Sequence, residues 1–180
     1  MILEPIEGSG PKTETLQERP KFSNYKPLFI IISLIFTATV TLALSDYASL
    51  VFSFKKTMSN FMAGFFLVFA GFKLLDLKGF AQAYSTYDLL ASRFQIYGYL
   101  FPLLEFSLGL FYLNGISDVP LNLFAVILMG FSGFGVLNAL SKKRKFQCAC
   151  LGTFIKLPLT HVTLFEDFGM ATMALLSLII

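Results

Sequence analysis

Two cysteines, Cys148 and Cys150, stand two residues apart in the segment QCACLG and are the only cysteines of the 180-residue chain. The thiolate is the reactive form of cysteine, and nearby cations favour it. A basic run, KKRK at 142–145, precedes the pair. Two thiols this close can cycle between a dithiol and a strained disulfide, or bind a soft metal ion. The pair therefore predicts redox or metal chemistry, the alternative being two incidental loop cysteines.

The single histidine, His161, follows the cysteines and extends the metal alternative. With Cys148 and Cys150 it would supply three ligands. A closed zinc site has four ligands, so Glu166 or Asp167 would have to complete the set. A surface histidine with no ligand role is the simpler interpretation of His161.

Glu105 is a carboxyl inside an apolar segment, three residues after Pro102. Within a membrane such a group is costly and faces the helix bundle or water. We expect Lys73 or Asn138 to be its partner, either for function or only to fix helix packing. Lys73 and Asp76 are three residues apart, which would put both on one helix face at the membrane boundary.

The segments that position these residues are apolar enough for a membrane. The chain is 56% hydrophobic and 14% charged, with a mean hydropathy of +0.71. Soluble domains carry about 25% charged residues, so soluble enzymes, DNA-binding domains and disordered proteins are excluded, and no nucleic-acid partner is expected. The sequence holds no phosphate loop, dinucleotide fingerprint or nucleophile–base pairing. We therefore favour a redox helper or transport component over a stand-alone enzyme.

Five stretches approach the ~20 apolar residues that a spanning helix needs. They are 27–45, 57–72, 94–113, 119–141 and 164–180. Thr163 and Glu166 form a capping-box pattern, which predicts that the last helix starts at Leu164. Glu166 and Asp167 would then lie in its first turn and suit the helix dipole.

The basic residues predict the orientation of the chain. If the N-terminus is inside, all 14 Lys and Arg except Lys55 and Lys56 fall on the cytoplasmic side. This positive-inside bias predicts that the N-terminus and the cysteine loop are cytoplasmic. The polar residues 1–26, with three prolines, predict a flexible tail.

Two further patterns concern packing. Apolar residues recur at helical spacing from Phe80 to Phe94, which predicts an interfacial helix with tyrosines at headgroup level. Small residues let spanning helices approach closely. Those expected to do so are Ala63, Gly64, Ala70, Gly71, Gly109, Gly130, Gly133 and Gly135.

Four short motifs occur in an order that resembles the MauE/DoxX group of small membrane proteins: KLLD (73–76), YDLLASR (87–93), PLLEF (102–106) and CACLG (148–152). The resemblance covers about residues 58–180. It implies an all-α, polytopic membrane protein with a four-helix transmembrane bundle at 58–180, to which the 27–45 helix is added at the N-terminus. It singles out Lys73, Asp76, Glu105, Cys148 and Cys150.

MauE is implicated in the maturation of methylamine dehydrogenase, a periplasmic enzyme with a disulfide-rich subunit. The resemblance thus implies a multi-pass protein of the bacterial inner membrane. Its Cys148 and Cys150 would support thiol–disulfide redox or the maturation of periplasmic proteins, with a thioredoxin-like partner. Because the chain has no second thiol pair, passing electrons across the bilayer would need a partner or a bound quinone.

Two alternatives stay open. The segment CLGTFIKLPLTHVTLFED resembles a subgroup seen beside heavy-metal-handling proteins. This implies a soft, copper-like metal ion at Cys148 and Cys150 and a heavy-metal-binding partner. The other alternative is a non-catalytic assembly subunit.

Overall fold

The computed structural model describes residues 26–50, 52–141, 147–148, 157–158 and 161–180. Within them lie six helices and two very short strands. The helices are α1 (Lys26–Ala48), α2 (Phe54–Leu75), α3 (Leu77–Tyr84), α4 (Gln95–Leu113), α5 (Val119–Ser141) and α6 (His161–Ile179). Strands β1 (Gln147–Cys148) and β2 (Leu157–Pro158) pair antiparallel. The predicted all-α class is confirmed.

Four of these helices, α1, α2, α4 and α5, are long and apolar enough to cross a membrane. They coincide with the first four predicted spans, and they make the chain a multi-pass membrane protein. The fifth span, which would be α6 with 19 residues, stays a prediction.

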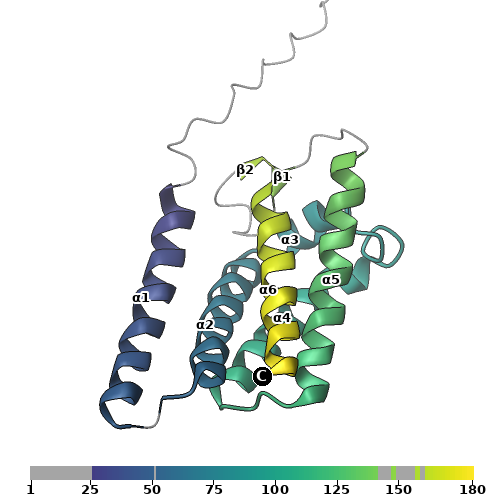
Figure 1. The fold of residues 1–180 in the computed structure, drawn as a ribbon. Helices are drawn as coiled ribbons and strands as arrows, with labels where there is room; N and C mark the ends of the chain where they lie inside the picture. The colour runs from purple at the N-terminus through teal and green to yellow at the C-terminus, as the bar shows by residue number, and fades with distance from the viewer. Residues whose placement is uncertain (1–25, 51, 142–146, 149–156, 159–160) are drawn as a thin grey trace, which may run out of the picture.

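Helices α2, α4, α5 and α6 form a bundle, with α2 packed on α4 and α5 on α6 (Figure 1). Helix α6 also contacts α2 and so joins the two pairs. Short helix α3 lies across one end of the bundle against α4, while α1 stands to one side and contacts α2. This is the predicted four-helix core with a separate N-terminal helix.

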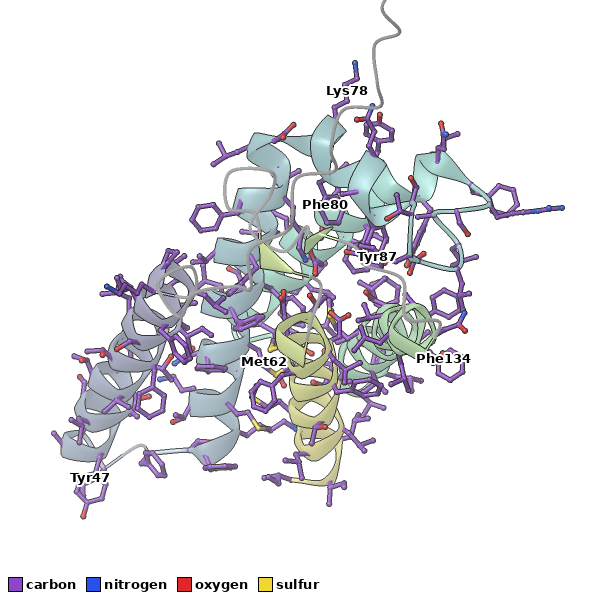
Figure 2. The ribbon with its side chains drawn as sticks, turned by 90° about the horizontal axis from the view of Figure 1, so that it is seen from above. Tyr47, Met62, Lys78, Phe80, Tyr87 and Phe134 are labelled. Atoms are coloured by element: carbon purple, nitrogen blue, oxygen red, sulfur yellow. The ribbon has the colours of Figure 1, made fainter. Side chains whose placement is uncertain are left out.

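The outer surface of the helices is apolar, as lipid contact requires. Figure 2 shows Tyr47 of α1 and Phe134 of α5 at the periphery, where both are exposed. Met62 of α2 points to the interior and is fully buried. Because lipid replaces water around the spans, these exposed apolar side chains suit a bilayer and do not argue for further protein contacts.

Glycines set the closest helix contacts. A Cβ atom added at Gly109 of α4 would lie 2.8 Å from Leu67 Cγ of α2. At Gly133 of α5 it would lie 3.2 Å from Asp167 Cβ of α6. The packing prediction was wrong for Gly71 and Gly130, where an added Cβ would meet nothing within 4 Å.

The single interfacial helix predicted for residues 80–94 was also wrong. Helix α3 covers only Leu77–Tyr84, and residues 85–94 form turns. The Asp88 carboxylate Oδ1 accepts hydrogen bonds from the backbone N–H groups of Leu90 (2.9 Å) and Ala91 (2.8 Å). A short acidic side chain that captures nearby backbone donors competes with helix formation, so the apolar periodicity continues through a segment that is not helical.

Candidate functional site

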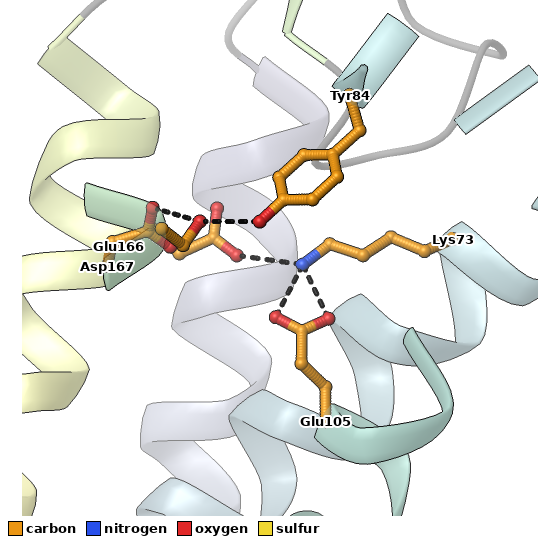
Figure 3. A network of polar contacts seen from close by, with 6 residues as sticks. Lys73, Tyr84, Glu105, Glu166 and Asp167 are labelled. Atoms are coloured by element: carbon orange, nitrogen blue, oxygen red, sulfur yellow. Dashed lines mark hydrogen bonds and ion pairs between the residues drawn. The ribbon is translucent and has the colours of Figure 1, made fainter. Parts of the chain in front are cut away.

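The interior of the bundle holds a buried ion pair between α4 and the last turn of α2. The Lys73 ammonium donates to both carboxylate oxygens of Glu105, each at 2.6 Å (Figure 3). Lys73 is 4% exposed and Glu105 is 2% exposed. Of the two partners expected for Glu105, Lys73 is the one that the structure places on it. The intramembrane carboxyl thus faces the bundle interior, as its cost in lipid demands.

Two further carboxyls reach the same place from α6. Glu166 Oε1 lies 3.8 Å from the Lys73 ammonium, and both Glu166 and Asp167 are buried. The sequence interpretation missed this role because it assigned Glu166 to a capping box. That assignment was wrong: α6 starts at His161, and its first turn contains no acidic residue. The available signal was an acidic pair inside an otherwise apolar helix.

A chain of hydroxyl groups leads from Asp167 to α3. Ser132 of α5 donates to Asp167 Oδ2 at 2.9 Å, and the Tyr84 hydroxyl donates to Ser132 Oγ at 3.3 Å. Burial raises the pKa of Tyr84 well above its ordinary value, and the nearby Asp88 adds to the effect. The Tyr84 phenol therefore stays protonated and donates the hydrogen bond to Ser132.

Aromatic rings close the cluster on the side of α3. The Lys73 ammonium lies 5.6 Å from the ring centre of Phe80 and 5.3 Å from that of Phe101. Tyr84 stacks on Phe80 with ring centres 5.1 Å apart. These distances suit cation–π attraction, and the rings also keep bulk water from the ion pair.

A cavity of about 10 Å³ remains between the polar groups, lined by residues that include Lys73, Ser132, Thr163, Glu166 and Asp167. A space of this size holds about one water molecule. Among the described residues no group forms a hydrogen bond with Glu166 Oε2, which is buried. The cavity therefore offers room for a water or a proton beside an acceptor that lacks a partner.

Asp88 fixes the segment that follows α3 against α5. An added Cβ at Gly135 would lie 3.2 Å from Asp88 Oδ2, so glycine is what admits the carboxyl here. Burial raises the pKa of Asp88, and the backbone hydrogen bonds from Ala91 and Leu90 oppose this rise. Asp88 is thus a structural anchor near Tyr84.

Asp76, which the sequence placed beside Lys73, caps a helix. Its carboxylate Oδ1 accepts a hydrogen bond at 3.0 Å from the backbone N–H of Gly79, in the first turn of α3. The chain turns from α2 into α3 at this residue. Lys73, three residues earlier, instead extends to Glu105.

The backbone of Cys148 pairs with Leu157, so β2 brings this strand to within a few residues of the start of α6. In Figure 1 the two strands lie at the end of the bundle where α3 lies and α6 begins. Cys150 and the side chains of Cys148 and His161 lie outside the described residues, and their chemical roles stay predictions. In the part of the chain that is described, no group of three His, Cys, Asp or Glu residues could hold a metal ion.

Comparison with known proteins gives one match. The family described as "Methylamine utilisation protein MauE" matches residues 26–180. The matched range includes α1, the bundle and every candidate residue named above. No curated protein and no solved structure matches the chain.

Proposed function

The chain belongs to the MauE family, and from this premise we propose that it is an inner-membrane helper of thiol–disulfide chemistry. Cys148 and Cys150 exchange electrons with a thioredoxin-like partner in support of periplasmic protein maturation. The observation that carries the proposal is that β2 and α6 connect the cysteine segment to the buried cluster around Lys73. Strand β1 ends at Cys148, and β2 pairs with it. Helix α6 follows β2 and places Glu166 3.8 Å from the Lys73 ammonium and Asp167 beside Ser132.

The exchange balances with the partner as the second reactant. When the pair is oxidised, two S–H bonds break and one S–S bond forms between Cys148 and Cys150. The two electrons and two protons reduce the disulfide of the partner to two thiols. A disulfide across a single intervening residue closes a small, strained ring, and strain favours the dithiol form. The pair is therefore expected to oxidise partners readily once it is itself oxidised.

The proposed orientation places this exchange on the cytoplasmic side, because the basic residues predict a cytoplasmic cysteine loop. The bilayer core is about 30 Å thick. Electrons exchanged with periplasmic proteins must therefore cross the bilayer on a second carrier. We propose that this carrier is a quinone or the thiol pair of a partner protein.

The test is to trap the thiols in cells. Acid-quenched membranes are treated with a thiol-reactive reagent of large mass, and the gel shift counts reduced cysteines, since the chain has only two. We expect two interconverting forms that respond to added oxidant and reductant. The Cys150→Ser variant should accumulate a mixed disulfide with the partner through Cys148.

The double Cys148→Ser, Cys150→Ser variant is the control and should show no shift. Cysteines that stay reduced under all conditions would refute the redox role. A double variant that fully replaces the wild-type protein in cells would instead support an assembly subunit.

A soft-metal site is the second candidate. Cys148 pairs with Leu157, and His161 follows Leu157 by only four residues in the sequence. Thiolates prefer ions such as Cu(I), which a heavy-metal-binding partner would deliver. Purified protein would then compete with a chelator for Cu(I), and the double serine variant would lose this ability. Equal binding by wild type and variant would remove this candidate.

A further inference from the structure

We propose that the cluster of Lys73, Glu105, Glu166 and Asp167 is a proton-binding site, with one exchangeable proton shared between Glu166 and Asp167. This inference does not rest on the cysteines. It concerns residues whose side chains are described, and its test is independent of thiol chemistry.

The first argument is the balance of charge. One ammonium, that of Lys73, faces three carboxyls from two helices. If all four groups were ionised, the buried cluster would carry two uncompensated negative charges. Uncompensated charge within a membrane bundle is costly. A proton on a carboxylate oxygen is the smallest ligand that offsets one of these two charges.

The second argument locates the proton on α6. Glu105 receives both of its 2.6 Å contacts from Lys73 and is fully compensated. Glu166 lies farther from the ammonium, at 3.8 Å, and Asp167 Oδ2 accepts from the neutral hydroxyl of Ser132. The excess acid is therefore the pair of adjacent residues on α6.

The third argument is an acceptor with no partner. Glu166 is 8% exposed, and no described group bonds its Oε2 atom. It lines the cavity of about 10 Å³, which Asp167 also lines. A water molecule there could bridge the two carboxyls, and a carboxyl that carries the proton would act as donor to it.

A chain of hydroxyl groups also leads from the α6 pair toward α3, and it ends at the buried Tyr84. The proton can pass between Asp167 and Ser132 and from Ser132 to Tyr84, because each hydroxyl both accepts and donates. Tyr84 is the last residue of α3, the helix that lies across one end of the bundle. The titratable groups around the α6 pair are Lys73, Glu105, Tyr97, Tyr84, Tyr87 and Asp88.

The test is infrared spectroscopy of the purified full-length chain in lipid, because a protonated carboxyl has a carbonyl band that a carboxylate lacks. We expect this band near neutral pH, with a loss as pH rises and a shift in heavy water. The isosteric variants Glu166→Gln and Asp167→Asn should each change the intensity of this carbonyl band, and the double variant should abolish the band. A spectrum without the band near neutral pH would overturn the proposal.

Two charge variants sharpen the test. Glu105→Gln frees Lys73 to compensate an α6 carboxylate and should weaken the band. Lys73→Gln removes the one ammonium that the described residues contribute to the cluster, and it should raise the intensity of the band by that of about one carboxyl. Asp118→Asn, an exposed carboxyl between α4 and α5, is the control and should leave the band unchanged. A band that persists in the Glu166→Gln, Asp167→Asn double variant would place the proton elsewhere and overturn the assignment.

Discussion

Lys73 and Glu105 are 32 residues apart in sequence, yet the lysine ammonium lies 2.6 Å from both carboxylate oxygens in the interior of the bundle. The contact ties α2 to α4. Since Glu166 approaches the same ammonium from α6, one lysine side chain links three helices. The ionised groups that could be costly in lipid thus become specific contacts between spans.

Removal of Lys73 should destabilise the bundle strongly. Loss of one partner of a buried ion pair costs about 3–5 kcal/mol, because the other charge stays buried. Lys73→Met leaves Glu105 and Glu166 without their cation, so we expect it to fall in this range. Glu105→Gln should cost less, since Lys73 keeps Glu166. Reversible unfolding in mixed micelles, followed by circular dichroism, measures both.

A double-mutant cycle completes this test. The Lys73→Met, Glu105→Gln variant removes both charges of the pair, and it should be more stable than the sum of the two single losses predicts. Strictly additive losses would show that the two side chains do not act as a pair.

Gly109→Ala should separate α2 from α4. Its added Cβ would lie 2.8 Å from Leu67 Cγ and 3.0 Å from the Leu67 backbone nitrogen, and the backbone cannot yield as a side chain does. Overpacking of this kind costs about 1–3 kcal/mol. Gly71→Ala is the matched control, because its Cβ would meet nothing. It should be neutral or slightly stabilising, since alanine is the better helix former. Equal effects of the two substitutions would contradict the close approach of α2 and α4 at Gly109.

Asp88→Asn should change how stability depends on pH. Burial raises the folded-state pKa of Asp88 above its ordinary 3.8. At pH values between 3.8 and the raised folded-state pKa, the folded protein therefore binds more protons than the unfolded chain. Stability falls as pH rises through this window. Asparagine keeps the acceptor for Leu90 and Ala91 but carries no charge. The variant should match wild type in acid and exceed it above the window.

Thermal unfolding in detergent at a series of pH values measures this difference. Asp88→Ala should lose stability at every pH, because it removes the acceptor itself. A difference between Asp88→Asn and wild type that does not vary with pH would contradict the burial effect.

Two single cysteines should report the orientation of α4. In a background with Cys148→Ser and Cys150→Ser, Ser92→Cys precedes the helix and Asn114→Cys ends it, and both positions are exposed. The positive-inside rule predicts that Asn114→Cys faces the periplasm. A maleimide that cannot cross the membrane should label it in intact spheroplasts, and should label Ser92→Cys only after permeabilisation. The reverse pattern would invert the proposed topology.

Composition and hydropathy alone determined that this chain belongs in a membrane, and where its first four spans lie. Both are local properties: a span needs only a long apolar run, and α1, α2, α4 and α5 each contain one. Glu105 also stood out in the sequence, because a carboxyl within such a run is costly wherever the helix packs. Its partner was narrowed to Lys73 or Asn138 and no further.

The tertiary structure decided which polar groups meet. Lys73 reaches Glu105 because α2 packs along α4 with Gly109 at the contact, and Glu166 and Asp167 join because α6 packs on α5 and also contacts α2. No local pattern encodes this. The spacing of Thr163 and Glu166 even favoured a helix cap. In the structure α6 begins at His161, and its Glu166 and Asp167 side chains are buried in the bundle. A buried charge depends on groups from distant helices for its compensation, so only the packed bundle identifies the site.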